Sequence, residues 1–183
     1  MSQKILLFII LVVTGYLIFK IVIPARWPSE MELVNTTLNS PNPSVQNQLQ
    51  LASFLIFTNG TKRDFSDTKY HYQSDAAFIT DANPAIIEIV KPAITWGEFF
   101  ATLPAPFKIT DECLFTGTGQ QFCTSGNRVL KFYVSGKKVT KILSQPIESG
   151  QQLLISYGVE TEAEIQAQFT QIPLPTEDSL PRM

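Results

Sequence analysis

Cysteine, histidine and charge are all scarce in this sequence of 183 residues. It contains two cysteines and one histidine, charged residues make up 16% of it, and the formal net charge is −2. A chain with so few cations argues against binding to nucleic acid, which depends on neutralising phosphates. A structural zinc site usually needs four cysteine or histidine ligands. We therefore expect no bound metal, no cofactor and no nucleic-acid partner.

Motifs of common active sites are also missing. There is no Gly-x-Ser-x-Gly, no phosphate-binding loop and no GxGxxG, and the run TGTG at 116–119 is too short to cradle a phosphate. The one histidine, His71, stands between tyrosines and is expected at the surface or on an edge strand. Glu88 lies in an apolar run and is expected on a partly wet face of a strand rather than as a catalytic acid. We expect a protein that is not an enzyme.

A long hydrophobic run stands near the N-terminus. Residues 5–23 contain one charge, and as a helix they rise about 28 Å, close to the hydrocarbon core of a bilayer at about 30 Å. Four residues flank or end the run with side chains that suit the membrane interface: Lys4, Lys20, Arg26 and Trp27. We expect an uncleaved transmembrane anchor. A cleaved signal peptide and a buried core helix are the alternatives.

The positive charges around this run do not decide its orientation. Lys4 and the α-amine stand on one side, against Lys20 and Arg26 on the other. The short N-terminal tail, residues 1–4, and a cysteine pair suited to an oxidising compartment favour a body outside the cytoplasm. The sequence therefore predicts a single-pass protein of the cell membrane with its C-terminal domain extracytoplasmic. The lipid bilayer and a protein at the cell envelope are the expected partners.

Composition divides the rest of the chain into three parts. Residues 24–48 are rich in proline, asparagine and serine and are expected to form a linker. Residues 49–170 are expected to form the folded domain, and residues 171–183 a disordered tail. Asn35 and Asn59 begin Asn-x-Thr sequons, which are glycosylation sites in a cell that has the transferase.

Residues 49–170 predict an α+β domain. Apolar or alternating patterns indicate strands over 51–57, 62–65, 75–80, 85–90, 128–134, 137–142 and 152–158. Thr95 and Glu98 form a capping-box pattern, followed by Trp96, Phe99 and other large apolar residues at helical spacing. This helix is expected to pack on a small mixed sheet, and a second, short helix is expected over 159–169. The C-terminal part predicts a β-grasp-like layout.

The order of several segments carries a resemblance to a known group. TNGTKRDFSDTKY, TWGEFFATL, CLFTGTGQQFC, LKFYVSGKKV and ESGQQLLISYG follow one another in residues 58–158. Together with the N-terminal anchor, this order resembles uncharacterised membrane-anchored bacterial and archaeal proteins, some of which carry a disulfide-isomerase label. Members of that group often have histidines at five positions where this chain has Leu51, Ser53, Phe78, Thr80 and Glu88. If those histidines bind a metal, this chain lacks the ligands.

The two cysteines, Cys113 and Cys123, allow four interpretations. They could form a structural disulfide, remain free, act as a redox pair or ligate a metal. A redox pair normally has the spacing Cys-x-x-Cys at a helix N-terminus, whereas here nine residues intervene and include the loop-forming TGTG. Asp111 and Glu112 stand beside the first cysteine and disfavour its thiolate. A disulfide closing a loop is the interpretation we favour.

These observations predict a membrane-anchored domain with a binding or structural role at the cell surface. The alternative is a thiol–disulfide oxidoreductase or an envelope assembly factor that uses the same two cysteines.

Overall fold

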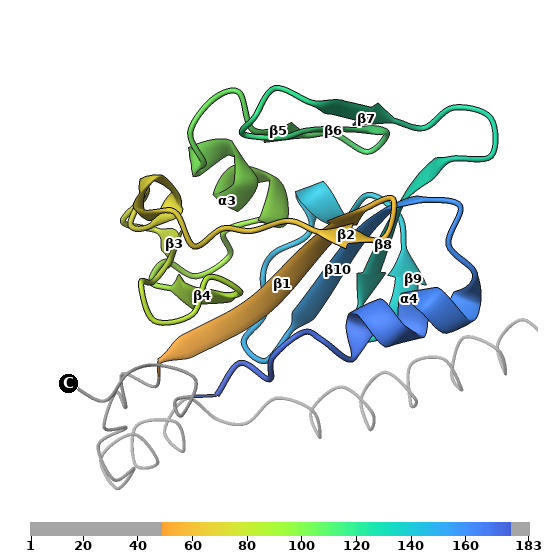
Figure 1. Cartoon of the computed structure of the whole chain (residues 1–183). Coiled ribbons are helices and arrows are strands. Elements are labelled where there is room, and N and C mark those ends of the chain that lie inside the picture. Colours follow the sequence, from red (N-terminus) through yellow and green to blue (C-terminus); the bar gives the residue numbers. More distant parts are fainter. Residues whose placement is uncertain (1–48, 177–183) are drawn as a thin grey trace, which may run out of the picture. The chain divides into compact units, whose positions relative to one another are not determined.

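The computed structural model describes residues 49–176, so the expected anchor and linker lie outside the described part of the chain. The described residues fold into an α+β domain with two sheets and two α-helices (Figure 1). In chain order the elements are β1 (Gln50–Thr58), β2 (Thr61–Lys62), the 3-10 helix η2 (Thr68–Tyr70), β3 (Ala77–Ile79), β4 (Ile86–Ile89), α3 (Trp96–Thr102), β5 (Lys108–Ile109), β6 (Cys113–Phe115), β7 (Gln121–Cys123), β8 (Val129–Val134), β9 (Lys137–Val139), the 3-10 helix η3 (Ile142–Ser144), β10 (Gln152–Gly158) and α4 (Glu162–Phe169). Within residues 49–176, no helix has the length and apolar character needed to cross a bilayer.

The larger sheet is built around a parallel pair. Its strand order is β3-β4-β1-β10-β8-β9, and β2 pairs with the end of β1. β1 and β10 run parallel in the centre, and their outer neighbours β4 and β8 are antiparallel to them. Every residue of β1 except the first is buried. This confirms the central strand expected from apolar residues on both of its faces.

Helix α3 packs on one face of the larger sheet. Trp96, Phe99 and Phe100 are at most 2% exposed and join one core cluster with residues of β1, β8 and β10. The expected capping box is present, because Thr95 Oγ1 accepts from the Glu98 amide at 3.2 Å and Glu98 Oε2 accepts from the Thr95 amide at 2.8 Å. The helical spacing and the cap predicted from the sequence are both confirmed.

Helix α4 and the segment after it cover the other face. Ile165 of α4 and Ile172 are buried against Leu55, Leu154 and other residues of the sheet. The side-chain amide of Gln152 donates to the backbone carbonyl of Ile172 at 3.1 Å. The packed part of the domain therefore continues beyond residue 170, where the sequence placed its end, because Ile172 supplies a further apolar side chain. Residues 177–183 of the expected tail lie outside the described residues.

Several elements are shorter than expected. The return strand expected over 62–65 is only Thr61–Lys62, because Asp64 Oδ1 accepts from the amide of Ser66 at 2.9 Å and the chain turns there. The strand expected over 137–142 ends at Val139, and Lys141 adopts a left-handed backbone with φ of 56° before η3. The helix expected over 159–169 begins at Glu162, where a capping box with Thr161 as its first residue fixes the start.

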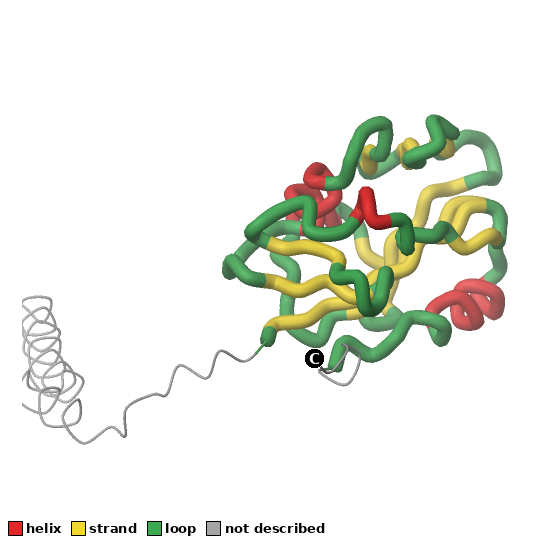
Figure 2. Tube along the Cα trace, turned by 60° about the vertical axis from the view of Figure 1, so that its left-hand side comes forward, coloured by secondary structure: helices red, strands yellow, loops and turns green. Residues whose placement is uncertain are grey.

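The smaller sheet, with order β5-β6-β7, is not joined to the larger one by strand pairing. Figures 1 and 2 both show it at one end of the domain, beyond α3 and the chain around η2. Its strands have two or three residues each. Such short strands have little stability of their own, so this sheet depends on its contacts with the rest of the domain.

Candidate functional site

The two cysteines occupy opposite positions on neighbouring strands. Cys113 of β6 pairs with Cys123 of β7, their Cα atoms are 4.1 Å apart, and a disulfide joins them. This confirms the bridge that the sequence favoured. The segment between the cysteines, expected as a flexible loop, is instead a β-hairpin that turns at Gly119, whose φ is +81°. A residue without Cβ suits that left-handed backbone.

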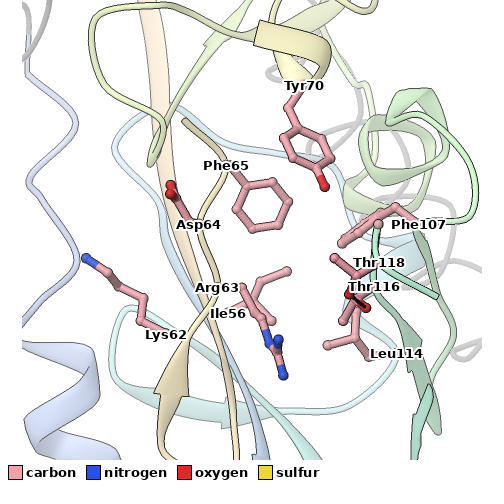
Figure 3. Close-up of a pocket in the computed structure, with 11 residues that line it drawn as sticks. Ile56, Lys62, Arg63, Asp64, Phe65, Tyr70, Phe107, Leu114, Thr116 and Thr118 are labelled. Atoms are coloured by element: carbon pink, nitrogen blue, oxygen red, sulfur yellow. Dashed lines mark hydrogen bonds between the residues drawn. The ribbon is translucent and has the colours of Figure 1, made fainter. Parts of the chain in front are cut away.

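A cavity of about 290 Å³ lies where the hairpin faces the larger sheet. One wall comes from β1, β2 and the chain up to η2, and the other from β6, the turn after it and the residue before β5 (Figure 3). The lining residues are Ile56, Lys62, Arg63, Asp64, Phe65, Tyr70, Phe107, Leu114, Thr116, Gly117 and Thr118. Most of the inward side chains are apolar or aromatic, with hydroxyls and one guanidinium among them, which is the usual make-up of a small-molecule site.

The aromatic side chains of the cavity pack closely against one another. Phe65 contacts Tyr70 and Phe107 edge to face, with ring centroids 5.1 and 5.6 Å apart. Tyr70 reaches over the hairpin so closely that a Cβ on Gly117 would collide with its hydroxyl. Glycine at 117 therefore lets the hairpin approach Tyr70, and the two walls meet there.

Arg63 links the two sheets at the edge of the cavity. Its Nε donates to Thr58 Oγ1 at 2.6 Å, one Nη donates to the same oxygen, and the other donates to Gln120 Oε1 at 3.1 Å. The guanidinium carbon lies 5.0 Å from the ring centroid of Phe122 on β7. Burial lowers the pKa of Arg63 from its ordinary value. Among residues 49–176, no carboxylate forms an ion pair with it.

His71 is buried, contrary to the expectation of a surface position. It does lie beside the edge strand β3, where it forms an isolated bridge with Ile79, but it is only 7% exposed. Its Nδ1 lies 2.6 Å from Asp81 Oδ1 and its Nε2 lies 3.0 Å from the carbonyl oxygen of Phe65. The partner ten residues along the chain explains why a polar ring can be buried here. His71 thereby holds the backbone of Phe65, a residue of the cavity wall.

The other candidate site residues from the sequence, where the structure describes them, do not line the cavity or lie at the disulfide. Asn59, the second sequon, is exposed in the turn between β1 and β2 with φ of 49°. Glu88 is half-buried on β4, in line with the partly wet face expected for it. The membrane-flanking residues and the first sequon lie outside the described residues: Lys4, Lys20, Arg26, Trp27 and Asn35.

The five positions at which the resemblance leads us to expect histidines lie together. Leu51 and Ser53 are on β1, Glu88 is opposite Leu51 on β4, Phe78 is opposite Glu88 on β3, and Thr80 directly follows β3. Side chains two residues apart on a strand share a face, so all five occupy one face of three neighbouring strands. Across the described part of the chain, no three side chains of His, Cys, Asp or Glu gather in a metal-binding group.

Comparison with known proteins does not extend these observations: no family model, no curated protein and no solved structure matches the chain.

Sequence reasoning missed the cavity itself. Arg63, Tyr70 and Thr118 are separated by up to 55 positions and come from elements with different patterns. The glycine-rich run TGTG is too short to bind a phosphate, but its residues 116–118 form part of the cavity wall, so it was the one hint of this site in the sequence.

Proposed function

We propose that this chain is a single-pass membrane protein whose α+β domain stands outside the cytoplasm and binds a small molecule between its two sheets. The observation that carries the binding role is the cavity, whose walls come from separate sheets and whose lining combines aromatic rings with the half-buried guanidinium of Arg63. Pockets of this composition are the usual sites for small ligands. Binding rather than catalysis is proposed, since the lining offers no nucleophile paired with a base.

The disulfide supports the extracytoplasmic location. Disulfides persist in oxidising compartments and are rare in the cytosol. The apolar run over 5–23 supports the anchor by its length. The two arguments are independent, because one depends on the redox chemistry of the compartment and the other on the thickness of the bilayer.

The resemblance to membrane-anchored bacterial and archaeal proteins also belongs to this proposal. The order β4-β1-β10-β8-β9, with a parallel central pair and α3 between β4 and β8 in the chain, supports the β-grasp-like layout expected from the sequence. The five positions at which this chain lacks the expected histidines share one face of the sheet, which supports the resemblance.

The rival proposal is a thiol–disulfide oxidoreductase or assembly factor that uses Cys113 and Cys123. A redox cysteine is typically activated at a helix N-terminus. Here both cysteines lie within β-strands, which favours a structural bridge. A Cys113→Ser variant separates the two roles. Loss of thermal stability is expected of a structural bridge, whereas an enzyme would stay as stable as before and lose turnover.

Labelling with a membrane-impermeant maleimide on intact cells tests the location. Before reduction no label should attach, and after reduction both cysteines should become reactive, with denaturing lysis as the control for burial. Labelling that appears only after lysis, and without any need for reductant, would place the thiols inside the cell and reject the proposed topology.

Ligand screening with a blocked cavity tests the binding role. The full chain in nanodiscs is compared with Thr118→Trp, which fills the mouth of the cavity, and with Thr140→Trp, an exposed position after β9. The lipid takes up apolar fragments equally in all three samples, so a difference in fragment binding between the proteins comes from the cavity. Fragments should bind the wild type and Thr140→Trp, and Thr118→Trp should lose them. Equal binding to all three proteins would reject the cavity as the site.

A further inference from the structure

The guanidinium of Arg63 has unused hydrogen-bonding capacity at the cavity. A guanidinium carries five N–H donors, and three of them are engaged by Thr58 and Gln120. Figure 3 shows the Arg63 side chain at one end of the cavity, while its neighbours Lys62 and Asp64 point away from Phe107 and Leu114 on the opposite wall. As far as residues 49–176 show, one N–H on each terminal nitrogen is left for a further acceptor.

Within residues 49–176, no carboxylate pairs with the charge of Arg63. Arg63 is half-buried, and a cation that loses part of its water is stabilised by an anion close by. Asp64, the adjacent residue, uses its carboxylate for the amide and hydroxyl of Ser66, both at 2.9 Å. The nearest acid in the sequence is therefore held by another partner. The two free N–H groups of Arg63 match the two oxygens of a carboxylate.

The rest of the cavity is suited to an apolar body. Ile56, Phe65, Phe107 and Leu114 line it, each of them at most 8% exposed. Its volume of about 290 Å³ is larger than the roughly 150 Å³ cavity that holds a benzene molecule. One ring or branched chain with a short acid arm fits this space.

We propose that the cavity binds small carboxylic acids that carry one aromatic ring or branched alkyl group, with the carboxylate held by Arg63 and the apolar group between Phe65 and Leu114. This inference rests on the proposed binding function and adds the chemical class of the ligand. The charged end supplies selectivity, because a hydrogen bond between two charged groups is stronger than its neutral counterpart.

Equilibrium dialysis with matched probes tests the inference. The full chain in nanodiscs of zwitterionic lipid is titrated with 3-phenylpropionate and with 3-phenylpropionamide, which has the same shape without the charge. The wild type should bind the acid at least about tenfold more tightly than the amide. In Arg63→Gln this preference should fall to less than about threefold, whereas Arg128→Gln, at an exposed arginine outside the cavity, should keep it.

The comparison of the two probes on the wild type needs no variant, so it remains decisive even where Arg63→Gln unfolds the hairpin. Equal affinity for acid and amide would overturn the proposed ligand class and leave the cavity as a binding site for neutral molecules. Binding of the amide alone would overturn it in the same way. Failure of both probes to bind the wild type would also overturn it. If the wild type still binds fragments in the screen described above, only the ligand class is wrong and the proposed binding function stands.

Discussion

Removing the disulfide between Cys113 and Cys123 should lower the stability of the domain by an amount that can be derived from the structure. The cysteines are 10 positions apart, and closing a loop of that size removes chain entropy worth about 2.7 kcal/mol at 25 °C from the unfolded state. The full value applies only when the hairpin unfolds together with the domain. Leu114 lies beside Cys113 on β6, is fully buried and belongs to the core cluster of the larger sheet. Unfolding of the hairpin is therefore coupled to unfolding of that core.

Urea unfolding of the full chain in nanodiscs measures this effect. In a Cys113→Ala/Cys123→Ala double variant, the free energy of unfolding should fall by about 2–3 kcal/mol, and the melting temperature by roughly 8–12 °C. Wild type treated with a phosphine reductant should match the double variant, and the reductant should leave the double variant unchanged. A loss of less than about 0.5 kcal/mol with an unchanged m-value would refute the coupling through Leu114.

Three further predictions concern the larger sheet and its helices. The ammonium of Lys131 is 10% exposed and lies 2.9 Å from the carboxylate of Glu160. Glu160→Gln removes that negative charge, so the free energy of unfolding measured in urea titrations should drop by about 3 kcal/mol or more. A drop below about 1 kcal/mol would contradict this prediction. Thr95→Ala removes the oxygen that caps α3 and should lower the free energy of unfolding by about 1 kcal/mol. An unchanged stability in thermal unfolding would show that the cap contributes nothing. Hydrogen bonds from Thr95 hold the pKa of Glu98 below its ordinary value of 4.5, so this carboxylate stabilises the fold above that pH and loses its contribution as the pH falls through the lowered pKa. The stability difference between wild type and Glu98→Gln should accordingly be largest near neutral pH and close under acid conditions, and a difference constant with pH would disprove the assignment.

The elements that the sequence predicted well are those decided by local patterns. β1 carries apolar side chains on both faces over most of its length, and only a central strand buries both. Thr95 and Glu98 begin α3 through hydrogen bonds between residues three positions apart, so the cap is visible in the sequence. The pairing of the two cysteines was also predictable, because the chain contains no other partner for either of them.

The features that the sequence did not predict depend on contacts between distant segments. His71 is buried because Asp81 and the Phe65 carbonyl come to its two nitrogens, and nothing in KYHYQ specifies those neighbours. The hairpin between the cysteines was expected as a loop, since its strands have only three residues each and give no clear alternation. Its strands are stabilised by packing and by the bridge rather than by intrinsic propensity.

The disulfide holds together the hairpin that forms one wall of the cavity. A three-stranded sheet with such short strands does not hold its shape in water unless something fixes it. Here two constraints act on the same hairpin: the bridge ties β6 to β7, and Arg63 ties β7 to the larger sheet through Gln120 and Phe122. The hairpin supplies one wall of the cavity, with Leu114 at its base. Fixing that wall in advance lowers the entropy lost when a ligand binds. A structural disulfide is one way to preorganise a binding site, and the bridge between Cys113 and Cys123 therefore agrees with the binding role that we propose for the domain.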